Sequence, residues 1–191
     1  MRAVSWIPNP RLRCREHTFL TMLKSIIIIA GASNSGKSST LRVLKKKLNH
    51  VEERNFYSFK GKGICIYPSS PQEISGIDFC DYQEIIKYIE DKIRRCQARN
   101  CTLLIMPFVM KGERNGKSLN ENCIEKPIAA LKSAGYRVRL VYLRKTSGRK
   151  KHLCQMDDLM SRLKAQEISS RRGDRKRQAA ELWRIVRRVD P

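Results

Sequence analysis

Residues 31–38 carry the combination of residue types in this chain that best suits phosphate binding. Their sequence is Gly-Ala-Ser-Asn-Ser-Gly-Lys-Ser. Gly31 and Gly36 permit backbone angles that other residues resist, so successive N–H groups can turn inward around an anion. Lys37 can reach the outer phosphates of a nucleotide, and the Ser38 hydroxyl can bind Mg²⁺. The stretch therefore predicts a site for nucleotide phosphates.

The flanks of this stretch predict the two elements that such a loop requires. Residues 25–30 (SIIIIA) show no polar alternation, which is typical of a strand buried on both faces in a parallel sheet. Leucines at 41, 44 and 48 predict a helix over residues 38–49, whose free N–H groups would face the same anion. The residues expected to contact the nucleotide are Gly31, Ala32, Ser33, Asn34, Ser35, Gly36, Lys37, Ser38 and Ser39. The alternative is a glycine-rich turn whose lysine binds nothing.

On this motif and its flanks, the chain resembles the P-loop NTPase superfamily over roughly residues 23–170. The resemblance implies a three-layer α/β fold that binds ATP or GTP together with Mg²⁺. ATP is favoured, because the sequence lacks the Asn-Lys-x-Asp motif by which GTPases usually recognise guanine. The stretches FKGKGICIY (59–67), Lys-Gly-Glu (111–113) and Gly-Tyr-Arg-Val (135–138) are similar to those of small kinase-like P-loop proteins of microbes and phages.

The carboxylate that would help to hold Mg²⁺ is harder to predict. The buried strand expected at residues 102–106 is stopped by Pro107 and offers no acidic residue at its end. Glu73 is the first choice for metal binding or general-base work, because it follows a strand end, and Asp78 is the second. Each of them is alternatively a plain loop or cap residue. Asp81 is better interpreted as a helix N-cap, and Glu113 is a weaker option.

Phosphoryl transfer also needs cations that offset the developing negative charge. In nucleotide kinases a mobile lid after the fourth strand supplies arginines, and the resemblance places Arg162, Arg171 and Arg172 in that region, with Gly173 as a hinge. The competing interpretations are a solvated helix face and a surface that contacts nucleic acid.

The remaining hydrophobic patterns predict an α/β domain with a mainly parallel central sheet. Residues 56–59 and 64–67 read as a β-hairpin with a glycine-supported turn, and residues 81–98 as an amphipathic helix. A helix carrying apolar residues at 124, 128 and 131 follows, either with a capping box at Ser118 and Glu121 or with Pro127 at its start. Residues 137–143 predict a strand, and residues 153–168 and 175–189 predict helices.

The composition indicates one domain with a strong excess of positive charge. Hydrophobic residues make up 41% of the 191 residues, which excludes a disordered or collagen-like chain. Forty Lys and Arg against 18 Asp and Glu give a net charge of +22, which favours a polyanionic partner such as DNA or RNA. The expected division is an irregular basic extension (1–21), the nucleotide-binding domain (22–170) and a basic C-terminal helix (171–191) that packs on it or extends from it.

Other classes of site and location are disfavoured. The seven Cys form no Cys-x-x-Cys pair, which argues against a zinc site and favours reduced thiols in a cytoplasmic protein. The longest apolar run, residues 26–30, is too short to cross a bilayer, and no secretory signal is visible.

Three functions remain open. The first is an ATP-dependent, kinase-like phosphotransferase that acts on a nucleoside, a nucleotide or a nucleic-acid end. The second is an ATP-gated nucleic-acid-binding module, or a weak ATPase without a phosphoacceptor, that binds DNA or RNA through its basic C-terminal region. The third is an ATP-binding subunit without chemistry.

Overall fold

A computed structural model describes residues 23–32, 35–50, 55–71, 81–109, 113–114, 117–118, 122–144, 150–169 and 174–189. Its strands are β1 (Ser25–Gly31), β2 (Asn49–His50), β3 (Phe56–Phe59), β4 (Lys62–Ile66), β5 (Cys101–Val109), β6 (Glu113–Arg114), β7 (Lys117–Ser118), β8 (Arg137–Arg144) and β9 (Gln166–Ser169). Its helices are α2 (Lys37–Lys45), α3 (Tyr82–Ala98), α4 (Asn122–Ser133), α5 (Lys150–Arg162) and α6 (Arg175–Arg188).

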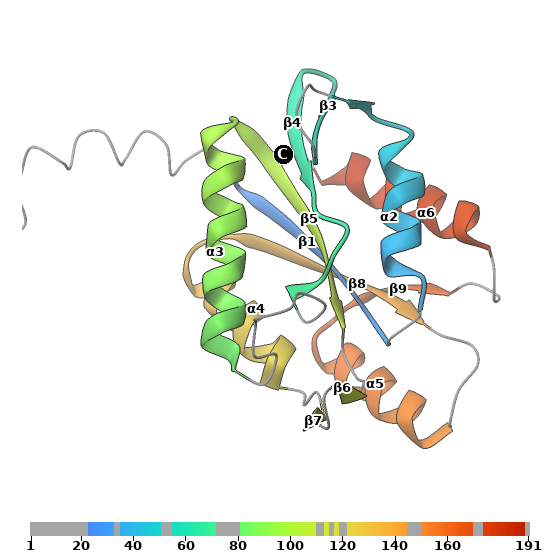
Figure 1. The fold of residues 1–191 in the computed structure, drawn as a ribbon. Coiled ribbons are helices and arrows are strands. Elements are labelled where there is room, and N and C mark those ends of the chain that lie inside the picture. Colours follow the sequence, from blue (N-terminus) through green and yellow to red (C-terminus); the bar gives the residue numbers. More distant parts are fainter. Residues whose placement is uncertain are drawn as a thin grey trace, which may run out of the picture.

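The described strands form one large sheet and one small ribbon. The large sheet has seven strands in the order β2-β3-β4-β5-β1-β8-β9, and β6 pairs with β7. The five strands from β4 to β9 in that order run parallel, whereas β3 is antiparallel to β4 and β2 to β3. β1 therefore lies in the middle of the parallel part, and all seven of its residues are buried (Figure 1).

Helices cover both faces of the sheet and create two cores. The even-numbered residues Ile26 and Ile28 of β1 pack in the core that includes α3, α4 and α5. The odd-numbered Ile27 and Ile29 pack in the core that includes α2 and α6 (Figure 1). Alternate strand residues point to opposite faces, so an unbroken apolar run is what a central strand of this kind needs. The expected three-layer α/β fold with a mainly parallel sheet, a hairpin and a basic C-terminal helix is confirmed.

Strand β5 is longer than the sequence pattern suggests. The expectation that Pro107 stops the strand at residue 106 is wrong, since Pro107 pairs with Ile29 and the strand continues to Val109. The amide of Tyr67 donates to the Ile105 carbonyl, so the backbone polar groups of residue 105 point toward β4. Those of residue 107, two positions later, point to the same side of β5, but β4 has already ended there. The missing N–H of Pro107 therefore costs no hydrogen bond of the sheet.

Three helices also differ from the expectation. The helix expected over residues 38–49 is α2, which ends at Lys45, and Asn49 lies in the unpredicted strand β2. Pro127 is neither a start nor a stop, because α4 begins at Asn122 and contains it, and Ser118 lies in β7 instead of capping this helix. The helix expected over residues 153–168 is α5, which ends at Arg162, and a turn at Lys164 (φ 53°) leads into β9. The last third of that predicted helix is therefore wrong, and β9 was not predicted.

The hairpin agrees with its sequence. β3 and β4 pair with Phe59 opposite Lys62, so Lys60 and Gly61 form a two-residue turn. Both turn residues have positive φ, 50° and 74°, as the right-handed twist of a tight hairpin requires. The predicted extension at residues 1–21 lies outside the described residues. None of the helices in the described part is long and apolar enough to cross a membrane.

Candidate phosphate-binding site

The glycine-rich stretch joins the carboxyl end of the central strand to the start of a helix. Gly31 is the last residue of β1, and Lys37 is the first residue of α2. On the two sides of β1, Gly31 pairs with Val109 of β5, and Ala30 pairs with Tyr142 of β8. The carboxyl ends of β5 and β8 therefore lie beside Gly31 at the same end of the sheet.

Gly31 lies where there is no room for a side chain. A Cβ at this position would lie 2.6 Å from Ser35 Oγ and 3.0 Å from the carbonyl oxygen of Leu143. The amide of Ser35 also donates to the carbonyl of Ala32 over 3.2 Å. Ser35 therefore lies close over the ends of β1 and β8, and any residue other than glycine at position 31 would have to displace Ser35 and crowd the Leu143 carbonyl.

Gly36 leaves the start of α2 open. It is the N-cap residue in the left-handed conformation (φ 91°), and as a glycine it supplies no side-chain cap. Gly36 O accepts from the Thr40 amide over 2.8 Å, as the first bond of the helix. The N–H groups of Lys37, Ser38 and Ser39 precede that bond, and the first turn contains no acidic residue. This end of α2 therefore offers donors and a positive dipole end to an anion.

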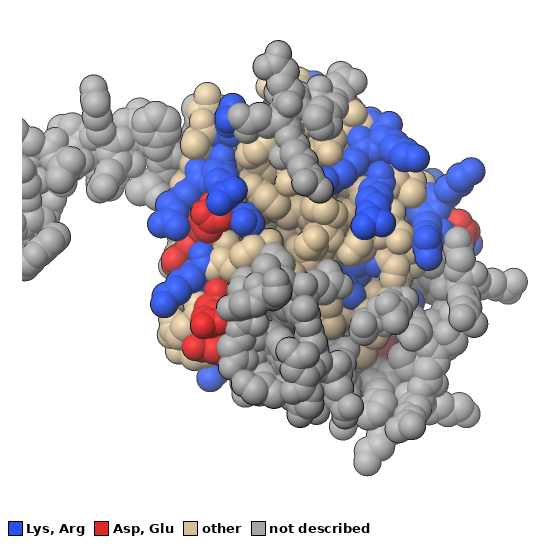
Figure 2. Space-filling model, in the orientation of Figure 1, with Lys and Arg blue, Asp and Glu red and all other residues tan. Residues whose placement is uncertain are grey.

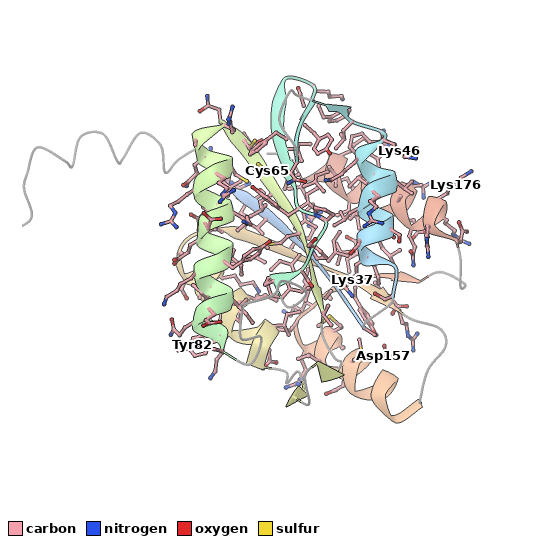
Figure 3. All side chains as sticks on the ribbon, viewed as in Figure 1. Lys37, Lys46, Cys65, Tyr82, Asp157 and Lys176 are labelled. Carbon is pink, nitrogen blue, oxygen red and sulfur yellow. The ribbon has the colours of Figure 1, made fainter. Side chains whose placement is uncertain are left out.

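The Lys37 side chain closes back over the loop that precedes it. Lys37 is only 3% exposed, and its Nζ donates to Gly31 O at 3.0 Å, to Ala32 O at 2.7 Å and to Ser35 Oγ at 3.4 Å. Figure 3 shows Lys37 at the end of α2 that meets the loop. A cation this deeply buried needs oxygen partners, and the phosphates of a nucleotide would be stronger ones than carbonyl groups.

The other predicted contacts are only partly described. Ser38 and Ser39 are half-buried in the first turn of α2, and Ala32 is half-buried at the end of β1. Ser33 and Asn34 lie outside the described residues. Ser38 is thus the one predicted metal ligand that the structure describes with its side chain. No group of three or more His, Cys, Asp or Glu that could hold a metal ion occurs in the described part of the chain.

The predicted carboxylates divide into three cases. Glu73 and Asp78 lie outside the described residues. Asp81 caps α3, because its carboxylate accepts from the Gln83 amide over 2.8 Å, which confirms its interpretation as an N-cap. Glu113 begins β6, four residues after β5 ends next to the loop, but only its backbone is described.

Of the three predicted lid arginines, the structure describes only Arg162, and it does not bring this residue to the loop. Arg162 ends α5, where its guanidinium lies 3.8 Å from Glu125 Oε1 of α4 and 3.5 Å from Asp158 Oδ2. These contacts hold it against α4. Arg171, Arg172 and the proposed hinge Gly173 lie outside the described residues.

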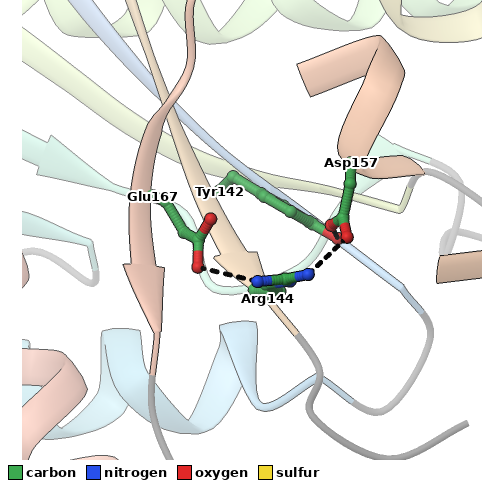
Figure 4. Close-up of polar contacts among 4 residues, drawn as sticks. All are labelled: Tyr142, Arg144, Asp157 and Glu167. Atoms are coloured by element: carbon green, nitrogen blue, oxygen red, sulfur yellow. Dashed lines mark hydrogen bonds and ion pairs between the residues drawn. The ribbon is translucent and has the colours of Figure 1, made fainter. Parts of the chain in front are cut away.

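A polar cluster at the end of β8 was missed by the sequence analysis (Figure 4). The Tyr142 hydroxyl donates to Asp157 Oδ1 at 3.0 Å, and the Arg144 guanidinium donates to Asp157 Oδ2 at 2.7 Å. Arg144 also lies 3.6 Å from Glu167 Oε1. Burial and the hydrogen bond to Asp157 raise the pKa of Tyr142, so its hydroxyl stays neutral and donates. Hydrogen bonding to Asp157 also raises the pKa of Arg144.

A second missed residue connects the last helix to the loop. Gln178 of α6 is buried, and its Oε1 accepts from the Thr40 hydroxyl over 2.9 Å. The same oxygen lies 3.5 Å from the place where a Cβ on Gly36 would be. Gln178 therefore braces the first turn of α2 against α6. Its distance of 138 positions from Thr40 leaves no local pattern that predicts the contact.

The fold is similar to those of solved proteins at low sequence identity. One is the crystal structure of APE1195, with 13% identity and a TM-score of 0.49 over 88% of this chain and 97% of that chain. Another is the tunicamycin resistance protein of Deinococcus radiodurans, with 16% identity and a TM-score of 0.48 over 85% of this chain and 95% of that chain. No protein-family model and no curated protein matches the sequence. Likeness at this level says nothing about what this chain binds.

Proposed function

We propose that this protein binds ATP with Mg²⁺ at residues 31–39 and transfers the terminal phosphoryl group to a nucleoside, a nucleotide or a nucleic-acid end. The observation that carries the proposal is the geometry around Lys37. A buried ammonium group lies over a loop that has no space for a side chain at Gly31 and leaves the first amides of α2 uncapped. These three features together make a cradle for a chain of phosphates.

In this proposal each part of the loop has a separate task. The amides at the start of α2 and those of residues 32–36 bind the phosphate oxygens, and Lys37 follows the outer phosphates. The Ser38 hydroxyl is a ligand of Mg²⁺, which neutralises the charge of the phosphates. Glu73 or Asp78 completes the metal site or acts as the base, and Arg171 and Arg172 offset the charge of the transferred group.

A second function is favoured by the charge of the molecule. A net charge of +22 exceeds what a small nucleotide acceptor needs. In Figure 2 the cations lie over α3 and over α2 and α6, whereas carboxylates gather mainly along α3. The alternative proposal is that ATP orders the loops and that the protein grips DNA or RNA with slow or absent turnover.

The test is ATP binding and turnover of the Lys37→Ala variant against a Lys46→Ala control. Lys46 is exposed at the opposite end of the same helix, so its loss removes one charge from α2 without touching the loop. We expect Lys37→Ala to weaken ATP binding about 100-fold, because charge-assisted contacts to phosphate contribute on the order of 3 kcal/mol. The control should bind ATP within about twofold of the native protein. Calorimetric titration with Mg²⁺ present measures both.

A panel of acceptors then separates the two functions. ATP consumption that depends on a nucleoside, a nucleotide or an oligonucleotide end, with a phosphorylated product, supports the phosphotransferase. Hydrolysis that DNA or RNA stimulates, without a phosphorylated product, supports the gated binding module. If the folded native protein does not bind ATP at all, both proposals fail.

A further inference from the structure

Strand β9 is shorter than β8 and leaves part of the edge of β8 open. The pairing of the two strands begins at Val141 with Gln166, so no described strand covers the outer edge of residues 137–140. A cavity of about 760 Å³ lies there, lined by residues of α4, β8, α5, β9 and α6. It adjoins the beginning of β8, whereas the loop at residues 31–38 adjoins its end. The cavity is therefore separate from the nucleotide site.

The lining of this cavity is strongly cationic. Five of the ten lining residues are basic: Lys132, Arg139, Arg162, Lys164 and Arg188. They come from four separate stretches of the chain, namely α4, β8, the end of α5 with the turn after it, and α6, so the fold brings them together. None of the ten lining residues is acidic.

Few carboxylates neutralise these cations. Arg162 pairs with Glu125 and Asp158 at 3.8 and 3.5 Å. The other four cations have no ion pair with any carboxylate in the described part of the chain. Lys132, Arg162 and Arg188 lie in the last turns of their helices, where the negative end of the helix dipole stabilises cations. That effect does not explain Arg139 in β8 or Lys164 in the turn before β9.

The cavity also has an apolar part. Ile128, Val138, Leu140 and Leu163 line it beside the cations. Ile128 and Leu140 are buried in the core, whereas Val138 and Leu163 are half-buried. An apolar wall next to cations suits a ligand with a flat, weakly polar ring and a phosphate attached to it.

A second basic hollow lies beside the beginnings of β4 and β5. A smaller cavity of about 170 Å³ is lined by Phe59, Lys60 and Lys62 of the hairpin and by Arg187. Arg187 and Arg188 are neighbours at the end of α6, and each lines one of the two cavities. The end of α6 therefore lies between two basic hollows, an arrangement that suits an extended polyanion better than a single phosphate.

We propose that these two hollows form a binding groove for single-stranded nucleic acid. The backbone phosphates follow the cations from the hairpin past the end of α6, and a base lies against the apolar part of the larger cavity. An unstacked base of a single strand can enter a hollow of this size, whereas the bases of a duplex are paired within the double helix and cannot enter the hollow. This groove does not depend on the proposed nucleotide site, because the loop lies at the carboxyl ends of the parallel strands and the groove lies at their amino ends.

The test compares two triple variants of the full chain that remove the same number of charges. One carries Lys132→Gln, Arg139→Gln and Arg188→Gln in the groove. The control carries Lys46→Gln, Lys47→Gln and Arg94→Gln, all exposed and outside it. Fluorescence anisotropy measures binding to a labelled thymidine or uridine strand of about 12 nucleotides and to a duplex of the same length, at about 50 to 200 mM salt.

We expect the groove variant to bind the single strand at least about tenfold more weakly than the control variant at equal salt. Its slope of log affinity against log salt should be about 2 smaller than that of the native protein, as expected for three lost phosphate contacts on a single strand. Equal losses in the two triple variants, no binding by the native protein, or tighter binding of the duplex would overturn the proposal. ATP titration of the groove variant tests the two sites independently. If the groove variant binds ATP as tightly as the native protein does, any loss of nucleic-acid binding arises in the groove and not at the nucleotide site.

Discussion

At the scale of single residues, the candidate phosphate site depends on three positions with different physical demands. Gly31 has no room for a Cβ, Gly36 needs a left-handed backbone, and Lys37 needs oxygen partners for a buried ammonium group. Each demand follows from the meeting of a strand end with a helix start, which the spacing of glycine, lysine and serine already indicates. The spacing of the motif could therefore predict a glycine at each of these two backbone positions and a lysine at the start of the helix.

Alanine at Gly36 tests the role of the left-handed position, with Gly135→Ala as a matched control. Both glycines have positive φ, 91° and 87°, so each substitution should cost about 1–2 kcal/mol of unfolding free energy. Only Gly36 leads into α2 at the loop, so only Gly36→Ala should also weaken ATP binding. Urea unfolding and calorimetric titration measure the two effects. Equal ATP affinity in both variants would remove Gly36 from the proposed site.

Other residues at this edge could not be predicted, for a physical reason. Arg144, Asp157 and Glu167 meet because β8, α5 and β9 pack together, and Gln178 meets Thr40 across 138 positions. In a chain with many charged residues, the sequence does not indicate which of them form ion pairs until the topology is known. The carboxylates Glu73 and Asp78 stay predictions.

At the scale of elements, α6 is coupled to the loop through α2. Thr40 and Gln178 form a buried hydrogen bond, and Leu41 and Leu44 of α2 share a core with Leu182 of α6. The start of α2 is therefore fixed by a helix from the other end of the chain. A shift of α6 would move the amides that are proposed to bind phosphate.

A double-mutant cycle on Thr40→Val and Gln178→Leu tests this coupling. Each single variant leaves one buried polar group without its partner, which costs about 1–3 kcal/mol of unfolding free energy. The double variant removes both groups, so its loss should be smaller than the sum of the two single losses by about 1 kcal/mol or more. Strict additivity in urea unfolding would show that the bond does not link the helices.

The elements were predicted well where periodicity is long and poorly where it is short. The run in β1, the pattern of α3 and the hairpin with its turn at Gly61 all have the expected form. β9 has four residues and continues an apolar spacing that a helix would also produce, so its sequence does not distinguish a strand from a helix. The sequence suggests that Pro107 ends β5, but a missing backbone N–H interrupts a strand only where a neighbouring strand would accept its hydrogen bond. β4 has ended at that point.

At the scale of the whole molecule, the two proposed sites lie at opposite ends of the parallel strands. The loop lies at the carboxyl end of β1, and the groove between the hairpin, α6 and α4 lies at the amino ends. The net charge of +22 predicts a polyanionic partner but not where it binds, because charge composition carries no positions. The groove could be found only from the fold.

The most direct test of the central claim is to map where ATP binds over the whole chain. Amide resonances of ¹⁵N-labelled protein are followed during titration with ATP and Mg²⁺. We predict that the largest shifts fall on Gly36, Lys37, Ser38 and Ser39 at the start of α2, with little change at Val138 and Arg188 beside the groove. Shifts confined to the groove, or none in the folded protein, would contradict the claim that residues 31–39 bind the phosphates.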